Sequence, residues 1–221
     1  MAVQIYSITS VADAIATAEA GADQLGVVVA EPGVLAEGVG IHAAREILAA
    51  ARPRARGLAL TLSDDRDEIC TIVDAVRPDI VHIGAREIDP DDCVWIRERV
   101  APVRLLRAIP VRAGETLSEA EAHQHCADYL MLEAGGKGAD LQQEWTLCRT
   151  VTGRSKVPVI LAGGLSAANV ASAIASVGPW GVDSFSNTDV PGQRGKKDPA
   201  RVRAFVAAAL RAFADLIESG N

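Results

Sequence analysis

The stretch "VPVILAGGLSAANVASAIASVGPWGVDSFS", residues 157–186, decides the fold. It starts with a short apolar run, turns at a Gly-Gly pair into a segment with helical spacing, and ends in a second short apolar run. Ser166 is expected to cap the helix and Gly178 to end it. Both runs are apolar on both sides, which is typical of parallel strands buried on two faces. The stretch therefore predicts a strand–helix–strand unit.

The same alternation runs along the whole chain. The eight expected strands cover residues 3–8, 24–29, 56–62, 79–84, 103–109, 129–134, 157–163 and 181–186. Ser10, followed by Asp13, opens a first helix, and Asp198 with Pro199 opens the last one. A doubly wound sheet would also alternate in this way. The count of eight, with no linker-like stretch between units, instead favours a (β/α)8 TIM barrel that forms a single α/β domain over residues 1–221.

The composition argues against several classes of partner. A net charge of −7 is unfavourable for a nucleic-acid-binding protein, which usually needs a basic face. No apolar run reaches the roughly 20 residues that span a bilayer, and the first residues lack the pattern of a signal peptide. The four cysteines are scattered, as buried thiols in a reducing compartment are. We therefore expect a cytoplasmic protein that binds neither nucleic acid nor membranes.

Polar and glycine residues follow the last two expected strands. Gly163 and Gly164 come directly after the seventh strand, and Ser186 and Asn187 come after the eighth. TIM barrels commonly bind phosphate at these positions, where backbone N–H groups approach the anion. A tight turn without a ligand is the alternative explanation of the Gly-Gly pair. We favour a phosphate site built from these four residues.

Four ionisable residues lie on expected strands and are candidates for the substrate pocket. They are His82, Arg107, Glu133 and Asp183. Because a charge inside a barrel is costly unless it is paired, we expect an ion pair between Arg107 and Glu133, either structural or in the site. His82 is either a proton shuttle or a satisfied core histidine. Asp183 is expected to be structural or to support the site, and no spacing of ligands predicts a metal.

Three segments resemble one enzyme family. "YSITSVADAIATAEAGADQLGVVVA" (6–30), "PVILAGGLSAANVASAI" (158–174) and "GVDSFSNTDVPGQRGKKDPARVRAFV" (181–206) are similar to phosphoribosylanthranilate isomerase, a barrel enzyme of tryptophan biosynthesis. The resemblance implies an aldose–ketose isomerase, an intramolecular oxidoreductase that needs no cofactor and binds a sugar phosphate. Its reaction is an Amadori rearrangement, in which an acid protonates the ring oxygen of an N-riboside and a base removes the C2 proton. We expect a monomer or a homodimer.

The catalytic positions depart from the family pattern. The family has a cysteine base followed by glycine, whereas this chain has Tyr6 and Ser7. A phenol has a pKa near 10 against about 8.5 for a thiol, so Tyr6 is a poorer base and better suited to donating a hydrogen bond. The resemblance places the general acid after the sixth strand, before a tryptophan. Glu144, directly before Trp145, matches best, and Asp140 remains an alternative.

The part of the site that would hold the aglycone is also changed. Gly33 stands where the family has an arginine for the anthranilate carboxylate, and the nearby Glu31 would repel a carboxylate. We therefore predict an isomerase of a phosphorylated ribose derivative, with an altered substrate left open. Two alternatives remain: an aldolase, lyase or epimerase that acts on a sugar phosphate, and a non-catalytic barrel that binds a phosphosugar.

Overall fold

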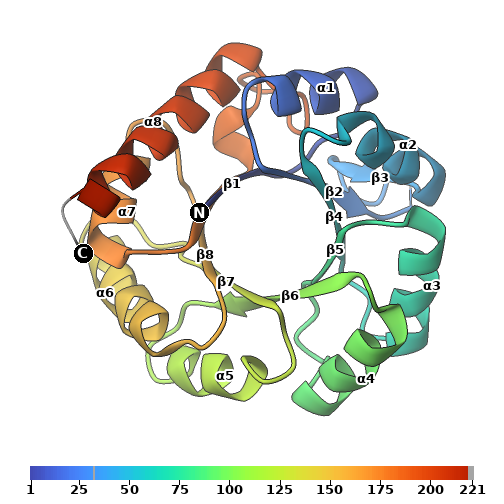
Figure 1. The fold of residues 1–221 in the computed structure, drawn as a ribbon, viewed down its shortest axis with the longest axis horizontal. Helices are drawn as coiled ribbons and strands as arrows, with labels where there is room; N and C mark the ends of the chain where they lie inside the picture. Colours follow the sequence, from blue (N-terminus) through green and yellow to red (C-terminus); the bar gives the residue numbers. More distant parts are fainter. Residues whose placement is uncertain (32, 219–221) are drawn as a thin grey trace.

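The computed structural model describes residues 1–31 and 33–218, and within these residues eight parallel strands close a barrel (Figure 1). The barrel strands are β1 (Ala2–Ile5), β2 (Gln24–Val29), β4 (Arg56–Thr61), β5 (Ile80–Ile83), β6 (Arg104–Pro110), β7 (Tyr129–Glu133), β8 (Val159–Ala162) and β9 (Gly181–Ser184). Pairing of β1 with both β9 and β2 closes the ring, which confirms the predicted fold. A further short strand, β3 (Gly38–Val39), pairs with β2 and was not predicted.

Helices surround the barrel and separate consecutive strands (Figure 1). They are α1 (Val11–Glu19), α2 (Ile41–Ala51), α3 (Arg66–Val76), α4 (Pro90–Val100), α5 (Thr116–His123), α6 (Ala139–Arg154), α7 (Val170–Val177) and α8 (Pro199–Glu218), with a 3-10 turn, η1 (Ser186–Thr188), after β9. In the described part of the chain, no helix is long and apolar enough to cross a membrane.

Of the three capping residues predicted from the sequence, two cap their helices in the structure and one does not. The hydroxyl of Ser10 accepts from the N–H of Asp13 at 3.1 Å, and a carboxylate oxygen of Asp198 accepts from the N–H of Ala200 at 2.8 Å, as capping residues should. The prediction that Ser166 caps α7 is wrong. The helix begins four residues later, because the side chain of Asn169 accepts from the N–H of Ser166 and holds the intervening residues in a turn.

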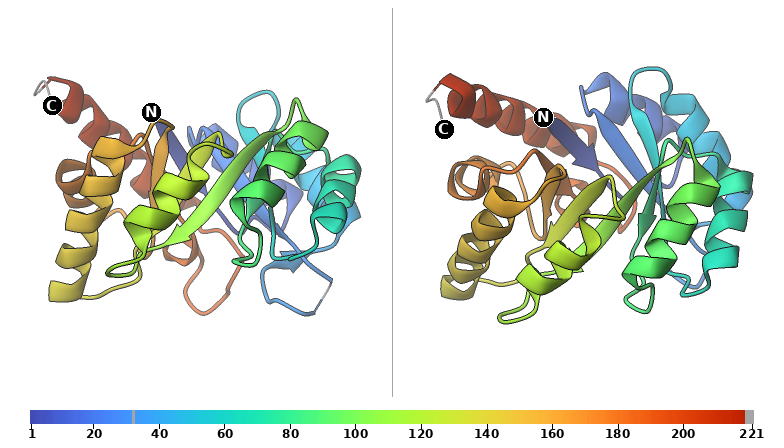
Figure 2. Two further views of the ribbon diagram at one scale, coloured as in Figure 1. Left: turned by 90° about the horizontal axis from the view of Figure 1, so that it is seen from below. Right: turned by 60° about the horizontal axis from the view of Figure 1, so that its bottom comes forward.

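The core has two parts, which explains why the strands are apolar on both faces. One part lies between the barrel and the helices. The other fills the barrel itself and consists of Tyr6, Leu58, Ile80, Leu106, Tyr129, Met131, Ile160 and Ala162. Each strand therefore contributes side chains alternately to the two parts. The loops between β2 and α2 and between β9 and α8 project from the face opposite the N-terminus (Figure 2).

Candidate active site

A cavity of about 210 Å³ lies at the C-terminal ends of the barrel strands. Its apolar wall includes Leu60, Met131 and Phe185. Eight of the twelve residues singled out from the sequence line it: Tyr6, His82, Glu133, Gly163, Gly164, Asp183, Ser186 and Asn187. The barrel thus brings residues that are far apart in the sequence to one small space, on the face where enzymes of this architecture carry their chemistry.

One side of the cavity offers backbone donors. Gly163 and Gly164 have positive φ angles of 103° and 63°, a conformation that glycine adopts without strain. The amide of Asn187 donates to the carbonyl of Gly164 at 2.9 Å, which ties the turn after β8 to the turn after β9. In the described residues, no acceptor is bonded to the N–H groups of Gly164, Ser186 and Asn187. These free donors can receive an anion.

Tyr6 lies just after β1, and its ring reaches across the barrel. Its hydroxyl and Nδ1 of His82 are 2.7 Å apart and share a hydrogen bond. Gly26 on β2 makes room for the ring, because a Cβ there would lie 2.3 Å from a ring carbon of Tyr6. Burial, with the charges of Asp183 and Glu133, raises the pKa of the phenol well above its usual value, so Tyr6 stays protonated at neutral pH.

His82 is neutral as well as buried. Burial, together with the positive charge of Arg107, lowers its pKa to about 3. Its Nε2 has no hydrogen-bond partner among the described residues. An imidazole with this pKa stays uncharged at neutral pH and is therefore poorly suited to act as a proton shuttle. Its hydrogen bond with Tyr6 fixes the orientation of the ring.

Asp183 on β9 is the buried carboxyl group of the cavity. Only 5% of its surface is exposed, and Gln4 on the adjacent strand donates to it at 3.1 Å. Burial raises the pKa of Asp183 to about 7, although the bond from Gln4 and the charge of Lys197 favour its ionised form. The sequence analysis did not single out Gln4. A glutamine in an otherwise apolar first strand was the available signal.

Glu133 is the second carboxyl group in the cavity, at the end of β7. Its side chain is open to solvent, yet the surrounding barrel wall raises its pKa by desolvation, and Arg86 and Arg107 oppose this rise. The cavity therefore holds two carboxyl groups, on β7 and β9, whose pKa values burial raises, and perturbed carboxyl groups in a cavity are candidates for acid–base chemistry.

Arg107, Glu144 and Asp140 do not line this cavity. The guanidinium of Arg107 donates to the backbone carbonyls after β5, at 2.6 Å in the case of Ala85, and the expected ion pair with Glu133 is not formed among the described residues. Register explains this, because Glu133 lies opposite Pro110 and not opposite Arg107.

The two acidic candidates on α6 have other surroundings. Glu144 accepts from the N–H of Gly136 at 2.8 Å and so holds the loop that leads into the helix. Asp140 is exposed in the first turn of α6, where a carboxylate favours the helix dipole. The structure therefore brings neither side chain to the cavity.

Ser7 is buried and does not line the cavity, but its backbone is unusual. Its φ angle is +64°, and its hydroxyl has no partner among the described residues. A left-handed conformation costs a residue with a Cβ about 1–2 kcal/mol, whereas glycine adopts it readily.

Replacing Ser7 with glycine is therefore expected to stabilise the fold. The gain should be about 1 kcal/mol, or about 2–4 °C in Tm for a chain of this size, measured by thermal and urea unfolding. Ser7→Ala is the matched control, because it removes the hydroxyl but keeps the Cβ. Equal stability of the two variants would show that the backbone is not the source of the gain.

Lys197 belongs with Arg194 and Lys196 to a basic run after β9, for which the sequence leaves two interpretations, a solvated loop or electrostatic guidance of a phosphorylated ligand. The side chain of Lys197 is buried, and its ammonium group contacts a carboxylate oxygen of Asp189 at 2.6 Å and the carbonyl of Phe185 at 2.9 Å. Arg194 in the same loop pairs with Glu37 at 3.0 Å. These contacts fix the loop after β9, which carries part of the cavity wall.

Comparisons with known proteins identify relatives. A family model described as N-(5'-phosphoribosyl)anthranilate (PRA) isomerase matches residues 3–208. An N-(5'-phosphoribosyl)anthranilate isomerase of Pseudomonas paraeruginosa is 36% identical over 212 residues, covering 93% of each chain. The enzyme of that name from Methanocella arvoryzae is 32% identical over 207 residues, or 92% of this chain and 95% of the relative.

Solved structures agree on the fold. Phosphoribosyl anthranilate isomerase from Thermotoga maritima superimposes with a TM-score of 0.83 at 24% identity, covering 96% of this chain and 99% of that one. Another structure of such an isomerase, in complex with reduced 1-(O-carboxyphenylamino)-1-deoxyribulose 5-phosphate, gives a TM-score of 0.81 at 24% identity over 96% and 99% of the two chains. The matching family and these relatives give no support to an aldolase, lyase, epimerase or non-catalytic barrel.

Proposed function

Because the chain belongs to the N-(5'-phosphoribosyl)anthranilate isomerase family, we propose that it catalyses an Amadori rearrangement of a phosphorylated N-riboside in the cavity at the C-terminal ends of its strands. One observation carries this proposal. The cavity combines the free backbone donors of Gly164, Ser186 and Asn187 with the two carboxyl groups of Glu133 and Asp183. The donors suit the 5'-phosphate, and the carboxyl groups suit the two proton transfers.

Glu133 is proposed as the general acid and Asp183 as the general base. Glu133 ends the sixth barrel strand, the part of the barrel in which the family resemblance places the acid, and desolvation raises its pKa. Asp183 lies on the strand beside Tyr6, where the resemblance places the base. Its pKa of about 7 matches a base that works near neutral pH.

The steps then balance without a co-reactant. Glu133 donates a proton to the ring oxygen, and the bond from C1 to that oxygen breaks to give an open-chain iminium ion. Asp183 takes the proton from C2, and the electrons of that C–H bond move to form an enolamine. Asp183 then gives its proton to C1 while the 2-hydroxyl proton passes to Glu133, so the enolamine becomes the ketone and both carboxyl groups return to their starting states. In the described residues, no three metal-ligating side chains are grouped together.

Tyr6 has a supporting part in this proposal, because its phenol stays protonated. Tyr6→Phe is expected to keep kcat/KM within about fivefold of the wild type, whereas loss of a general base would cost about 10² to 10⁴. The variant should lose about 1–3 kcal/mol of stability, because Nδ1 of His82 is left without its partner. Steady-state kinetics and urea unfolding check this. A loss of activity beyond a hundredfold in folded protein would assign the base to Tyr6.

The direct test of the function is turnover of phosphoribosylanthranilate, generated in the reaction mixture and followed by loss of its fluorescence. Turnover that saturates with substrate supports the proposal and shows that Gly33 is tolerated in place of a cation. The cavity lining contains neither Arg nor Lys, so other phosphoribosyl amines form the second panel. No turnover of either, with no rise in Tm on adding ribose 5-phosphate, would contradict the proposal.

We also propose a cytoplasmic location and either a monomer or a homodimer. The four cysteines are buried free thiols, which supports a reducing compartment. One solved relative, the enzyme of Thermotoga maritima, is described as dimeric, at 23% identity and a TM-score of 0.80. Light scattering on purified protein distinguishes the two states.

A further inference from the structure

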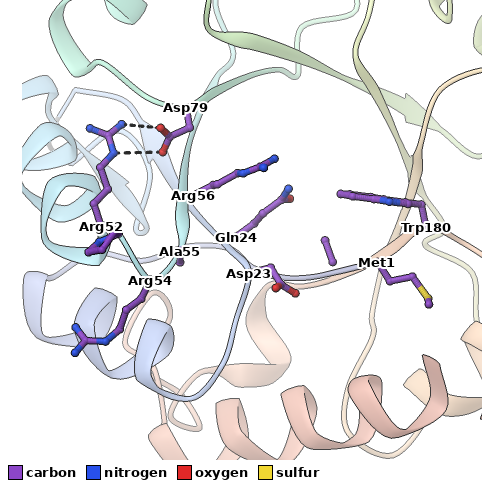
Figure 3. A pocket seen from close by; sticks show the side chains of 11 residues that line it. Met1, Asp23, Gln24, Arg52, Arg54, Ala55, Arg56, Asp79 and Trp180 are labelled. Carbon is purple, nitrogen blue, oxygen red and sulfur yellow. Dashed lines mark hydrogen bonds and ion pairs between the residues drawn. The ribbon is translucent and has the colours of Figure 1, made fainter. Parts of the chain in front are cut away.

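A second cavity opens on the opposite face of the barrel, where the strands begin (Figure 3). Its volume is about 500 Å³, within the range of about 300–1,000 Å³ that small-molecule sites occupy. Gln24 and Arg56, the first residues of β2 and β4, line it together with Trp180, the residue before β9. The proposed active site lies at the other ends of the same strands and shares none of these residues.

Three different side chains meet in the opening. Arg56 and Gln24 point into it from one side, and the indole of Trp180 points into it from the other (Figure 3). The ring of Tyr129 packs against the indole with centroids 5.4 Å apart, which supports the indole from within the barrel. One wall of the cavity is therefore the indole of Trp180, fixed in place by Tyr129, and it faces the side chains of Arg56 and Gln24.

Among the described residues, the side-chain oxygen of Gln24 has no hydrogen-bond partner and the guanidinium of Arg56 has no ion pair. Gln24 is only 2% exposed, and its Oε1 has no hydrogen-bond partner among the described residues. Gln4, beside it in the sheet, donates to Asp183 instead. The guanidinium of Arg56 has no ion pair in the described part of the chain, whereas Arg52 nearby is already paired. The oxygen of Gln24 needs a donor and therefore does not select a carboxylate, whereas the guanidinium of Arg56 is a donor without an ion pair and does.

The charge of the lining favours a single negative charge on the ligand. Arg52 pairs with Asp79 at 3.1 Å, so these two charges cancel (Figure 3). Asp23 accepts from the N–H of Val3 at 2.8 Å. Three arginines and two aspartates line the cavity, which leaves one positive charge in excess on a chain of net charge −7. Arg56 is the free guanidinium that points into the opening.

We propose that this cavity is a second binding site, specific for a small planar aromatic carboxylate. The ring stacks on Trp180, and the carboxylate receives charge-assisted hydrogen bonds from Arg56. The amide nitrogen of Gln24 can donate a further hydrogen bond to the same carboxylate, whereas its Oε1 accepts and gains no partner from this ligand. A second copy of the chain fits poorly here, because a two-fold axis at this face would bring the arginines of the two copies together.

The test is isothermal titration calorimetry with 2-naphthoate as the probe. We expect one site per chain, with binding at least tenfold weaker for 2-naphthamide, which lacks the charge, and for acetate, which lacks the ring. Arg56→Gln and Trp180→Leu should each weaken 2-naphthoate binding about tenfold or more. Arg104→Gln is the matched control. Arg104 begins β6 in the same way that Arg56 begins β4, but it does not line this cavity, so the control variant should bind normally.

Several results would overturn the proposal. Absence of binding, or binding that Arg56→Gln leaves unchanged, would do so. Competition between 2-naphthoate and ribose 5-phosphate would place the probe in the other cavity. A dimer by light scattering that Arg56→Gln dissociates would assign this face to a second copy of the chain. Unchanged 2-naphthoate binding in Glu133→Gln is the expected result and separates this site from the proposed active site.

Discussion

Replacing Glu133 with glutamine is expected to lower kcat for the proposed isomerisation by a factor of about 10² to 10⁴, the usual contribution of a positioned general acid. Glutamine has nearly the same shape but cannot give a proton to the ring oxygen. The loss should fall on kcat and leave KM within a few-fold, because Gly164, Ser186 and Asn187 still offer their N–H groups to the phosphate. Steady-state kinetics with the substrate that the wild type turns over measures both constants.

Two variants make this experiment decisive. Glu133→Asp keeps the carboxyl group but shortens its reach, so it should recover part of the activity that glutamine loses. Glu144→Gln is the control on α6. Its carboxylate holds the N–H of Gly136 and does not line the cavity, so the variant should stay within a few-fold of the wild type. A large loss of kcat in Glu144→Gln, with little loss in Glu133→Gln, would contradict this assignment. The general acid would then be Glu144, the residue before Trp145 that the family resemblance indicated.

The fold could be predicted from the sequence because its signals are local. Each strand is a short run buried on two faces, and four of the eight helices in the described residues begin at a side-chain cap, as at Ser10 and Asp198. The predicted start of α7 was wrong because it relied on one such capping residue. Ser166 has the right side chain for a cap, but the competing bond from its N–H to Asn169 places the first helical residue further along.

The sequence predicts where the cavity lies, but it predicts only some of the contacts and pKa values of the residues in it. Glycines after β8 and short polar residues after β9 have a known place in a barrel, so they could be positioned from strand order alone. The pairing of Arg107 with Glu133 could not, because the sequence carries no information on register between neighbouring strands, and a shift of three residues separates the two. Burial is likewise a property of the closed barrel, and burial gives Asp183 and Tyr6 their raised pKa values.

The Tyr6 position shows how a substitution is accommodated. A tyrosine ring needs space that a thiol does not. Gly26 supplies this space, and Nδ1 of His82 supplies a hydrogen-bond partner for the hydroxyl. These three residues come from three strands, so no local pattern connects them. The ring fills the interior of the barrel, and in the proposed mechanism the carboxyl groups beside it carry the proton transfers.

Replacing Asp183 with asparagine is expected to lower kcat/KM by about 10² to 10⁴, because the variant has no base for the C2 proton. In the wild type, kcat/KM should have an acidic limb that follows the ionisation of Asp183, whose pKa is about 7, and this limb should disappear in the variant. The substitution is not expected to disturb Gln4, since the amide oxygen of the new side chain can still accept the bond from Nε2 of Gln4.

The thermal stability of Asp183→Asn can be measured independently of its activity. We expect stability to increase where activity decreases. The pKa of Asp183 in the folded state, about 7, lies above its ordinary value of 3.8, so the folded protein holds a proton that the unfolded chain has released between these two pH values. The contribution of this group to the free energy of unfolding therefore falls as pH rises from about 4 to about 7. Asp183→Asn removes that penalty, so its Tm relative to wild type should increase from pH 4 to pH 8. A variant that is folded and more stable at pH 8 but inactive would assign the loss to chemistry. Retention of more than a tenth of the activity would show that another group takes the C2 proton.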